Sequence, residues 1–216
     1  MTDQGPEAVV DERQELELLV AQLERMRGML FGYSSLFFGR IRDWAIVSIA
    51  LLVLGASGLV PVALAPLPFI VPFAFLETGY LFYYTVFARR HAERLERAIN
   101  ERAGREILAA HRLEAAYFYE PDAPKIAAIS LRRPLGFMSA VTVGYSVGAF
   151  LLWLAGIVGL ADLVGSLADP GLMAWAVPAA LIWTAAIVVY LVWTSLRRPD
   201  ERRLLDALDS SYRTRS

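Results

Sequence analysis

Three long stretches of this chain carry almost no charged residues, and no other feature constrains its fold as strongly. Residues 44–88 contain a single charged side chain, Glu77. Residues 134–161 and 171–196 contain none. A helix needs about 20 apolar residues to cross the hydrocarbon core of a bilayer. Because the first stretch has room for two such helices, the sequence predicts an all-α, polytopic membrane protein with four transmembrane helices in two hairpins.

The charge pattern also sets the expected domain organisation. We expect a disordered N-terminus, a cytoplasmic amphipathic or coiled-coil helix, a transmembrane hairpin, a cytoplasmic helix and loop, a second hairpin and a cytoplasmic tail. These segments are, in order, residues 1–10, 11–43, 44–88, 89–133, 134–196 and 197–216. The expected spans are residues 44–60, 68–88, 136–160 and 172–196. Residues 125–131 fit either a short strand or an interfacial segment.

The positions of the basic residues predict the orientation. All 21 Lys and Arg residues lie within residues 1–42, 89–133 or 197–216. Short loops rich in Lys and Arg remain in the cytoplasm. We therefore expect a multi-pass protein of the inner (cytoplasmic) membrane, in contact with membrane lipids, with both termini in the cytoplasm.

The first cytoplasmic segment carries a heptad pattern. Its apolar residues recur at steps of three and four, which is typical of one face of a coiled coil. This seam comprises Leu16, Leu19, Leu23, Met26 and Leu30. Two interpretations remain open. The seam either joins subunits as a coiled coil or folds onto the central helix of its own chain.

Glu77 is the principal candidate for a functional residue. It lies roughly 14 Å from Pro68 and 18 Å from Arg89 along a helix, which is near the middle of a bilayer. Ionisable groups at that depth are costly and usually functional. Hydroxyl groups surround Glu77 in the sequence, and with it they would line a polar path or pocket: Thr78, Tyr80, Tyr83, Tyr84 and, from the third span, Tyr145. The alternative is a Glu77 that only holds the helices together.

Small residues recur every four positions in the third predicted span. They are Ala140, Gly144 and Gly148. This spacing lets helix backbones approach closely, so we predict a helix-packing face. The competing interpretation is that glycine is simply common in membrane helices.

Several classes of site are excluded or disfavoured. The chain has no cysteine, which excludes disulfides and thiolate metal sites. His91 and His111 are the only histidines, and we interpret both as surface residues rather than as metal ligands. No nucleotide-binding loop or hydrolase motif is present. We therefore expect no catalytic residue, no cofactor, no metal and no nucleic-acid partner.

Three functions remain compatible with these features. The leading hypothesis is a homo-oligomeric channel or transport component, because four spans form too thin a wall for a pore within one subunit. The second is a structural or regulatory membrane subunit that docks a cytoplasmic protein partner. The third is a membrane enzyme acting on lipid substrates, which a cluster of acids and arginines at the inner membrane surface would support.

Overall fold

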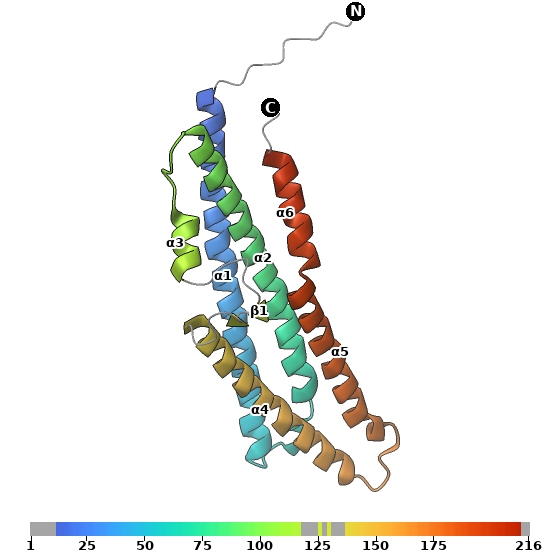
Figure 1. Cartoon of the computed structure of the whole chain (residues 1–216). Helices are drawn as coiled ribbons and strands as arrows, with labels where there is room; N and C mark the ends of the chain where they lie inside the picture. The colour runs from blue at the N-terminus through green and yellow to red at the C-terminus, as the bar shows by residue number, and fades with distance from the viewer. Residues whose placement is uncertain (1–11, 118–124, 127–128, 131–136, 213–216) are drawn as a thin grey trace, which may run out of the picture.

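A computed structural model of the chain describes residues 12–117, 125–126, 129–130 and 137–212. The predicted disordered segment, residues 1–10, lies outside these ranges. Long helices dominate the described part of the chain (Figure 1). They are α1 (Glu12–Ala56), α2 (Leu67–Arg102), α3 (Ala110–Tyr117), α4 (Phe137–Gly165), α5 (Ala176–Arg197) and α6 (Pro199–Tyr212). The predicted all-α architecture is confirmed.

Shorter elements join the helices. The 3-10 helices η1 (Pro61–Leu64) and η2 (Gly171–Trp175) lie in the connections that precede α2 and α5. The strands β1 (Lys125–Ile126) and β2 (Ile129–Ser130) form a small antiparallel pair, which agrees with the strand alternative for this segment. Gly104, with a φ of 62°, follows α2 in the left-handed conformation that commonly ends a helix.

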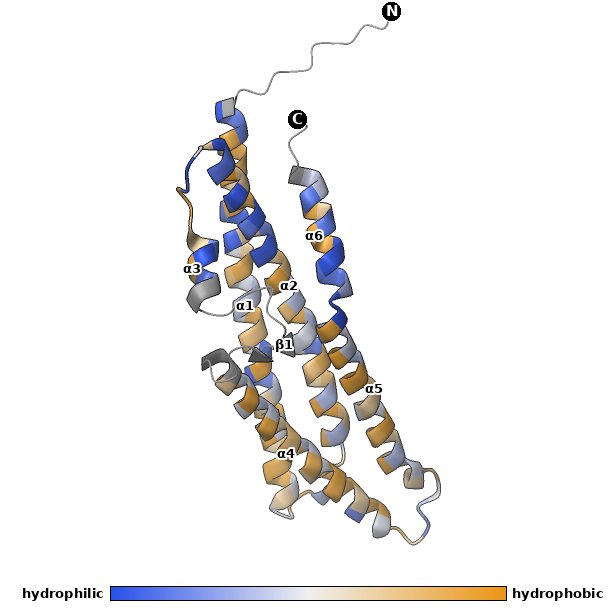
Figure 2. Cartoon of the chain, viewed as in Figure 1, coloured by the Kyte–Doolittle hydropathy of each residue, from blue (hydrophilic) through white to orange (hydrophobic). Residues whose placement is uncertain are grey.

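The bundle has a polar half and an apolar half (Figure 2). The polar half contains the N-terminal part of α1, the C-terminal part of α2, α3 and α6. The apolar half contains the rest of α1 and α2 together with α4 and α5. In the described residues, three helical regions are long and apolar enough to cross a membrane: Pro61–Arg102, Ala140–Gly165 and Gly171–Ser211.

The α1 helix is not one of these three regions. It runs without interruption through 45 residues, about 68 Å. Its charge-free segments, residues 28–39 and 44–56, are separated by Arg40, Arg42 and Asp43. The first predicted span, residues 44–60, therefore begins inside a continuous helix and extends past its end.

The heptad seam of α1 packs against α2 of the same chain. Leu19, Leu23 and Met26 are buried in one cluster with three residues of α2, namely Ala92, Leu95 and Ile99. Leu16 packs at the edge of this cluster, and Leu30 is half-buried. The structure therefore favours the second interpretation of the seam, in which the helix folds onto its own chain.

Close packing in the apolar half depends on glycines of α4. A Cβ atom on Gly156 would lie 2.6 Å from the Leu67 Cβ and from the Pro68 Cδ. A Cβ atom on Gly159 would lie 2.5 Å from the Leu64 Cβ. Because neither position has room for a side chain, α4 can approach η1 and the start of α2 directly.

The α5 helix runs parallel to α2. The Trp183 Nε1 donates a hydrogen bond to the Phe69 carbonyl oxygen at 3.2 Å, near the start of both helices. Further along, a Cβ atom on Gly79 would meet the Leu191 side chain at 3.4 Å. Arg198 separates α5 from α6 and has a φ of 45°, so the helix axis is broken there.

We predict that Gly156→Ala destabilises the protein by about 1–3 kcal/mol, because the new methyl group overpacks the contact with α2. Gly165→Ala, on the same helix, is the matched control, since a Cβ atom there meets nothing within 4 Å. Thermal unfolding of both purified variants in detergent measures the difference. Equal unfolding temperatures would contradict the packing described for α4.

Candidate functional site

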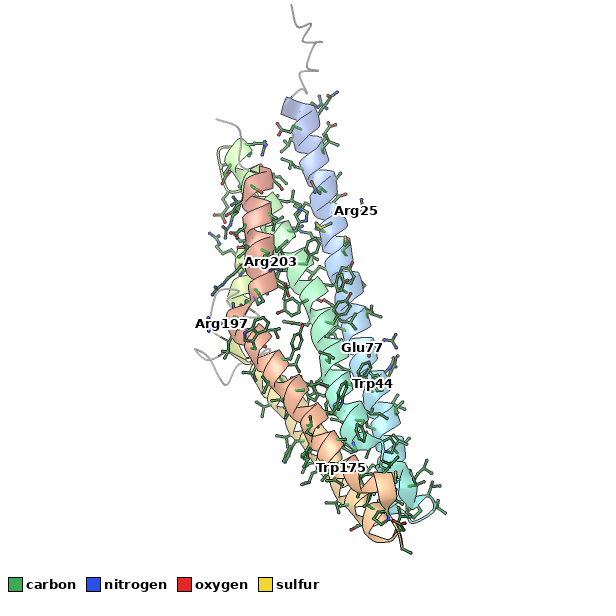
Figure 3. The ribbon with its side chains drawn as sticks, turned by 90° about the vertical axis from the view of Figure 1, so that its right-hand side faces the viewer. Arg25, Trp44, Glu77, Trp175, Arg197 and Arg203 are labelled. Carbon is green, nitrogen blue, oxygen red and sulfur yellow. The ribbon has the colours of Figure 1, made fainter. Side chains whose placement is uncertain are left out.

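Glu77 lies in a cluster of polar side chains from α1 and α2. The Trp44 Nε1 donates a hydrogen bond to Glu77 Oε2 at 2.6 Å. The Arg40 Nε lies 3.5 Å from the other carboxylate oxygen. Figure 3 shows Glu77 and Trp44 together on the side of the α1/α2 pair that faces away from α5. Both oxygens of Glu77 therefore have a partner from α1.

This arrangement corrects one inference from the sequence. In the predicted first hairpin, Arg40 and Arg42 directly precede one span and Arg89 and Arg90 directly follow the other, so all four would lie level at one membrane boundary. Instead Arg40 lies level with Glu77, which is 12 positions before Arg89, roughly 18 Å along α2. The physical reason is that α1 and α2 pair as two continuous antiparallel helices, and their register is set along the whole contact.

Two further charged residues of α1, Arg42 and Asp43, lie at the same level along the helix as Arg40 but do not contact Glu77. The Arg42 Nη2 lies 3.3 Å from the Asp43 Oδ1, and their side chains are 73% and 51% exposed. Arg40 and Glu77 are 49% and 28% exposed. We call these four residues the charged cluster. It is half-exposed on the surface of the chain.

The charged cluster lies within the charge-free length of the neighbouring helices. The contact between Gly79 and Leu191 fixes the level of α5. Leu191 lies about 9 Å before Arg197 and roughly 22 Å after the start of α5. Glu77 itself lies roughly 15 Å from the start of α2. These positions are well inside the apolar half of the bundle.

The predicted hydroxyl residues only partly gather around Glu77. Tyr80 and Tyr84 share its face of α2, and their hydroxyl oxygens lie 2.6 Å apart. The Tyr84 ring also contacts the Tyr33 ring, with 5.1 Å between centroids. Thr78 donates its hydrogen bond to the Ala74 carbonyl oxygen of its own helix. Tyr83 instead faces Thr194 of α5.

The α4 residues that were predicted to line the polar path or to form a packing face lie on the open surface of the chain. Tyr145 is 51% exposed, and no hydrogen bond or ring contact in the described part of the chain joins it to Glu77. A Cβ atom on Gly144 or Gly148 would meet nothing within 4 Å, and Ala140 is exposed. Among the described residues, nothing packs on the small-residue face of α4, and its role in contacts between chains stays a prediction.

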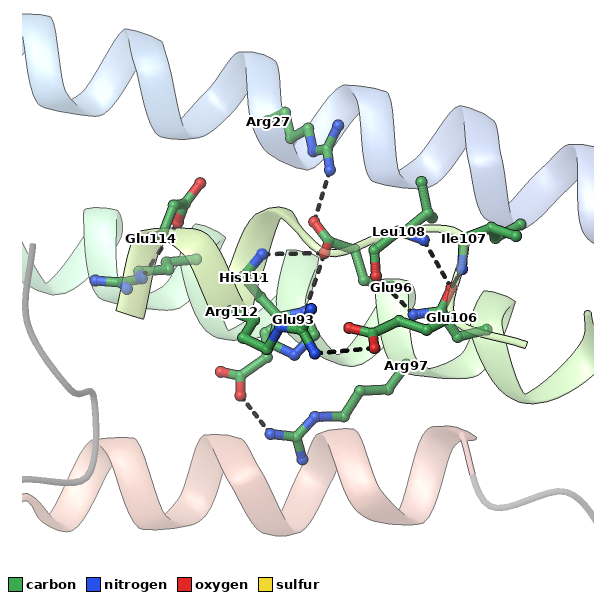
Figure 4. Close-up of polar contacts among 12 residues, drawn as sticks. Arg27, Glu93, Glu96, Arg97, Glu106, Ile107, Leu108, His111, Arg112 and Glu114 are labelled. Carbon is green, nitrogen blue, oxygen red and sulfur yellow. Dashed lines mark hydrogen bonds and ion pairs between the residues drawn. The ribbon is translucent and has the colours of Figure 1, made fainter. Parts of the chain in front are cut away.

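The polar half contains a buried carboxylate that the sequence did not reveal (Figure 4). Glu96 of α2 has a side chain only 3% exposed and binds Arg27 of α1 at 2.7 Å. Its second oxygen accepts a hydrogen bond from the His111 backbone N–H at 3.1 Å and lies 3.0 Å from the His111 Nδ1. Glu96 thus ties α1, α2 and α3 together.

These contacts change how Glu96 titrates and correct our view of the histidines. Burial raises the pKa of Glu96, but the hydrogen bonds from Arg27 and His111 outweigh burial and leave the pKa below its usual value. His111 is therefore a structural partner rather than a free surface residue. His91 is also half-buried, with its Nε2 3.4 Å from the Gln22 Nε2.

Acids and arginines also gather where α6 meets α2. Arg90 is 6% exposed, and its Nε and Nη2 donate to one oxygen of Glu201 at 3.0 and 2.8 Å. Arg94 pairs with Asp209 at 2.8 Å. A groove of about 240 Å³ lies beside these pairs. An arginine of α2 pairs with each of these carboxylates, so the ion pairs hold α6 against α2. In the described residues, no three His, Asp or Glu side chains are arranged to hold a metal ion.

We predict that Glu96→Gln lowers stability near neutral pH by roughly 1.5–3 kcal/mol, because Arg27 and His111 lose a charged acceptor. The folded pKa lies below the unfolded value of about 4.3, so the wild type keeps this contribution above that pH and loses it on further acidification. Unfolding temperatures measured between about pH 7 and pH 3 should therefore converge for the two proteins.

The exposed Glu106 provides the control for this measurement. Its side chain is 46% exposed and pairs with Arg112 on the surface. Exposed ion pairs contribute little, so Glu106→Gln should follow the wild-type curve at every pH. A constant gap between wild type and Glu96→Gln down to the most acidic point would contradict the assigned role of the carboxylate.

Comparisons of the chain with protein-family models, with curated proteins and with solved structures found no match. The arrangement of its own charged side chains is therefore the feature that indicates its function.

Proposed function

We propose that the protein is a homo-oligomeric integral membrane channel or transport component, with Glu77 and Arg40 on its path. The observation that carries this proposal is the charged cluster, which lies half-exposed at the level of the apolar segments of α2, α4 and α5. In this topology the chain crosses the inner membrane four times, and both termini are cytoplasmic.

The energetic cost of exposed charge supports a water-lined path. A single charged residue at the middle of a bilayer costs about 2.5–3.5 kcal/mol on insertion scales. The Arg40–Glu77 pair reduces this cost, but both side chains remain accessible at the surface of one chain. Charged groups at that depth face water or other protein rather than lipid. In an oligomer, this side of the α1/α2 pair would border a hydrated passage.

The same reasoning assigns the first of the four spans to α1. Residues 28–39 lie level with the last part of the second span, as the contact between Tyr33 and Tyr84 indicates. Residues 44–56 continue to the end of the helix. We infer that α1 crosses the membrane through both segments, and that the charged cluster interrupts the crossing near its middle.

The two other functions have weaker support. Docking of a cytoplasmic protein partner is favoured by exposed apolar residues of the polar half, of which Leu18 and Leu113 are each 66% exposed. A membrane enzyme would need catalytic groups free to meet a substrate. The acids and arginines between α2 and α6 engage one another, and this favours a structural role for them.

The topology predicts which serines are accessible from each side of the membrane. Because the chain has no cysteine, Ser57→Cys, Ser166→Cys and Ser210→Cys each introduce one thiol. A membrane-impermeant maleimide applied to intact cells should label the first two variants. It should label Ser210→Cys only after the membrane is permeabilised. Labelling of Ser57→Cys only after permeabilisation would contradict a first span in α1.

The proposed path predicts an effect of Glu77 on flux. Proton, potassium and chloride fluxes are measured in proteoliposomes with wild-type protein and with Glu77→Gln at equal protein content. We expect the substitution to change flux at least about tenfold, the effect of a barrier change of ~1.4 kcal/mol. The reason is that Arg40 and Trp44 lose the charged acceptor that holds them.

Glu17→Gln is the matched control for the flux measurement. Its side chain is 68% exposed in the polar half, and it should conduct like the wild type. If neither the wild type nor Glu77→Gln passes any ion while both remain folded, the transport proposal fails. The exposed residues Leu18 and Leu113 would then be the place to search for a docked protein.

A further inference from the structure

We propose that the face of α1 opposite α2 is the contact between two copies of this chain, with the α1 helices parallel and Arg42 of each paired with Asp43 of the other. This inference rests on the homo-oligomer in the proposed function, and it names the surface that forms the oligomer. The surface comprises Arg42, Asp43 and the exposed residues of α1 above and below them.

The exposed face of α1 follows a regular helical period. Its residues recur at steps of three and four and all point away from the buried seam. They are Phe31, Ser35, Phe38, Arg42, Ile46, Ile49 and Val53. Phe31 is 79% exposed and Ile46 is 59% exposed, so the described part of the chain leaves this face uncovered. Arg42 occupies the centre of this row.

Small residues beside this row allow close approach of a second helix. A Cβ atom on Gly28, Gly32 or Gly39 would meet nothing within 4 Å. Helices in membranes associate where small residues let their backbones come together, because van der Waals packing replaces the hydrophobic effect there. These three glycines lie on the same side of α1 as Asp43.

The charges favour a second copy over lipid. Arg42 is 73% exposed, and it forms an ion pair with Asp43, the next residue in the sequence. At this depth a guanidinium on a lipid-facing surface is strongly unfavourable. A neighbouring helix that supplies both an acid and a base at the same level would satisfy both residues.

A second copy of the chain meets this requirement by symmetry. Copies with the same membrane topology are related by an axis along the membrane normal, so their α1 helices run parallel and equal positions meet. Arg42 and Asp43 have opposite charges in adjacent positions, so the patch is complementary to itself. Arg40 and Arg42 are two residues apart and point to nearly opposite sides of α1. The contact therefore leaves the Arg40–Glu77 side open.

Disulfide cross-linking tests this contact in native membranes. The chain has no cysteine, so Ser35→Cys places a single thiol on the proposed face. Ser48→Cys is a matched substitution on the α2 side of the same helix, where the serine is 3% exposed. Val189→Cys, 67% exposed on α5, measures random collision. We expect a cross-linked dimer from Ser35→Cys alone. Equal cross-linking from Val189→Cys would overturn the proposal.

Charge reversal tests the pairing between copies. In the Ser35→Cys background, Arg42→Asp and Asp43→Arg should each lower the cross-linked fraction by about tenfold, and the two together should restore it. Circular dichroism and elution volume identify any variant that fails to fold. A folded double variant that stays as weak as the single variants would overturn the proposed Arg42–Asp43 pairing.

The outcomes separate this contact from the proposed transport function. Flux that depends on Glu77, without cross-linking of Ser35→Cys, would overturn the α1 contact and leave the transport function in place. Cross-linking that responds to the charge reversals, without any flux, would support the α1 contact and remove the transport function.

Discussion

The contact between α1 and α2 is the interaction on which the rest of the structure depends. In the polar half it is an apolar seam, with Leu23 and Leu95 in one buried cluster. In the apolar half it becomes a polar contact, where Trp44 and Arg40 bind Glu77. A single antiparallel register satisfies both parts. The remaining helices pack against this pair.

The interactions that hold the other helices against the α1/α2 pair differ between the apolar half and the polar half. In the apolar half, α4 approaches through Gly156 and Gly159, where backbone proximity and van der Waals contact provide the stability. In the polar half, α3 is held by the contacts of His111 with the buried Glu96, and α6 is held by the buried ion pair between Arg90 and Glu201. Buried charges require partners of good geometry, so these pairs specify where each short helix lies.

Most of the fold was predictable from the sequence, whereas the site was predictable only in part. Charge-free stretches predicted the long apolar helices, and the heptad steps identified the buried face of α1. Glu77 was identified because an isolated acid in an apolar stretch is conspicuous. Its partner Arg40 was missed, since nothing in the sequence says which residue of α1 lies level with Glu77. Glu96 was missed because it lies in a segment rich in Glu and Arg, where nothing in the sequence distinguishes a buried acid from its exposed neighbours.

The sequence by itself determined which segments are apolar, which face of α1 is buried and where the basic residues concentrate. These properties depend on local composition and on helical periodicity, which do not require knowledge of neighbouring segments. The tertiary structure decided the register of α1 against α2, and with it the pairing of Arg40 with Glu77 and the exposed position of Arg42. Register depends on the length of the connection and on packing along the whole helix pair, which no local pattern contains.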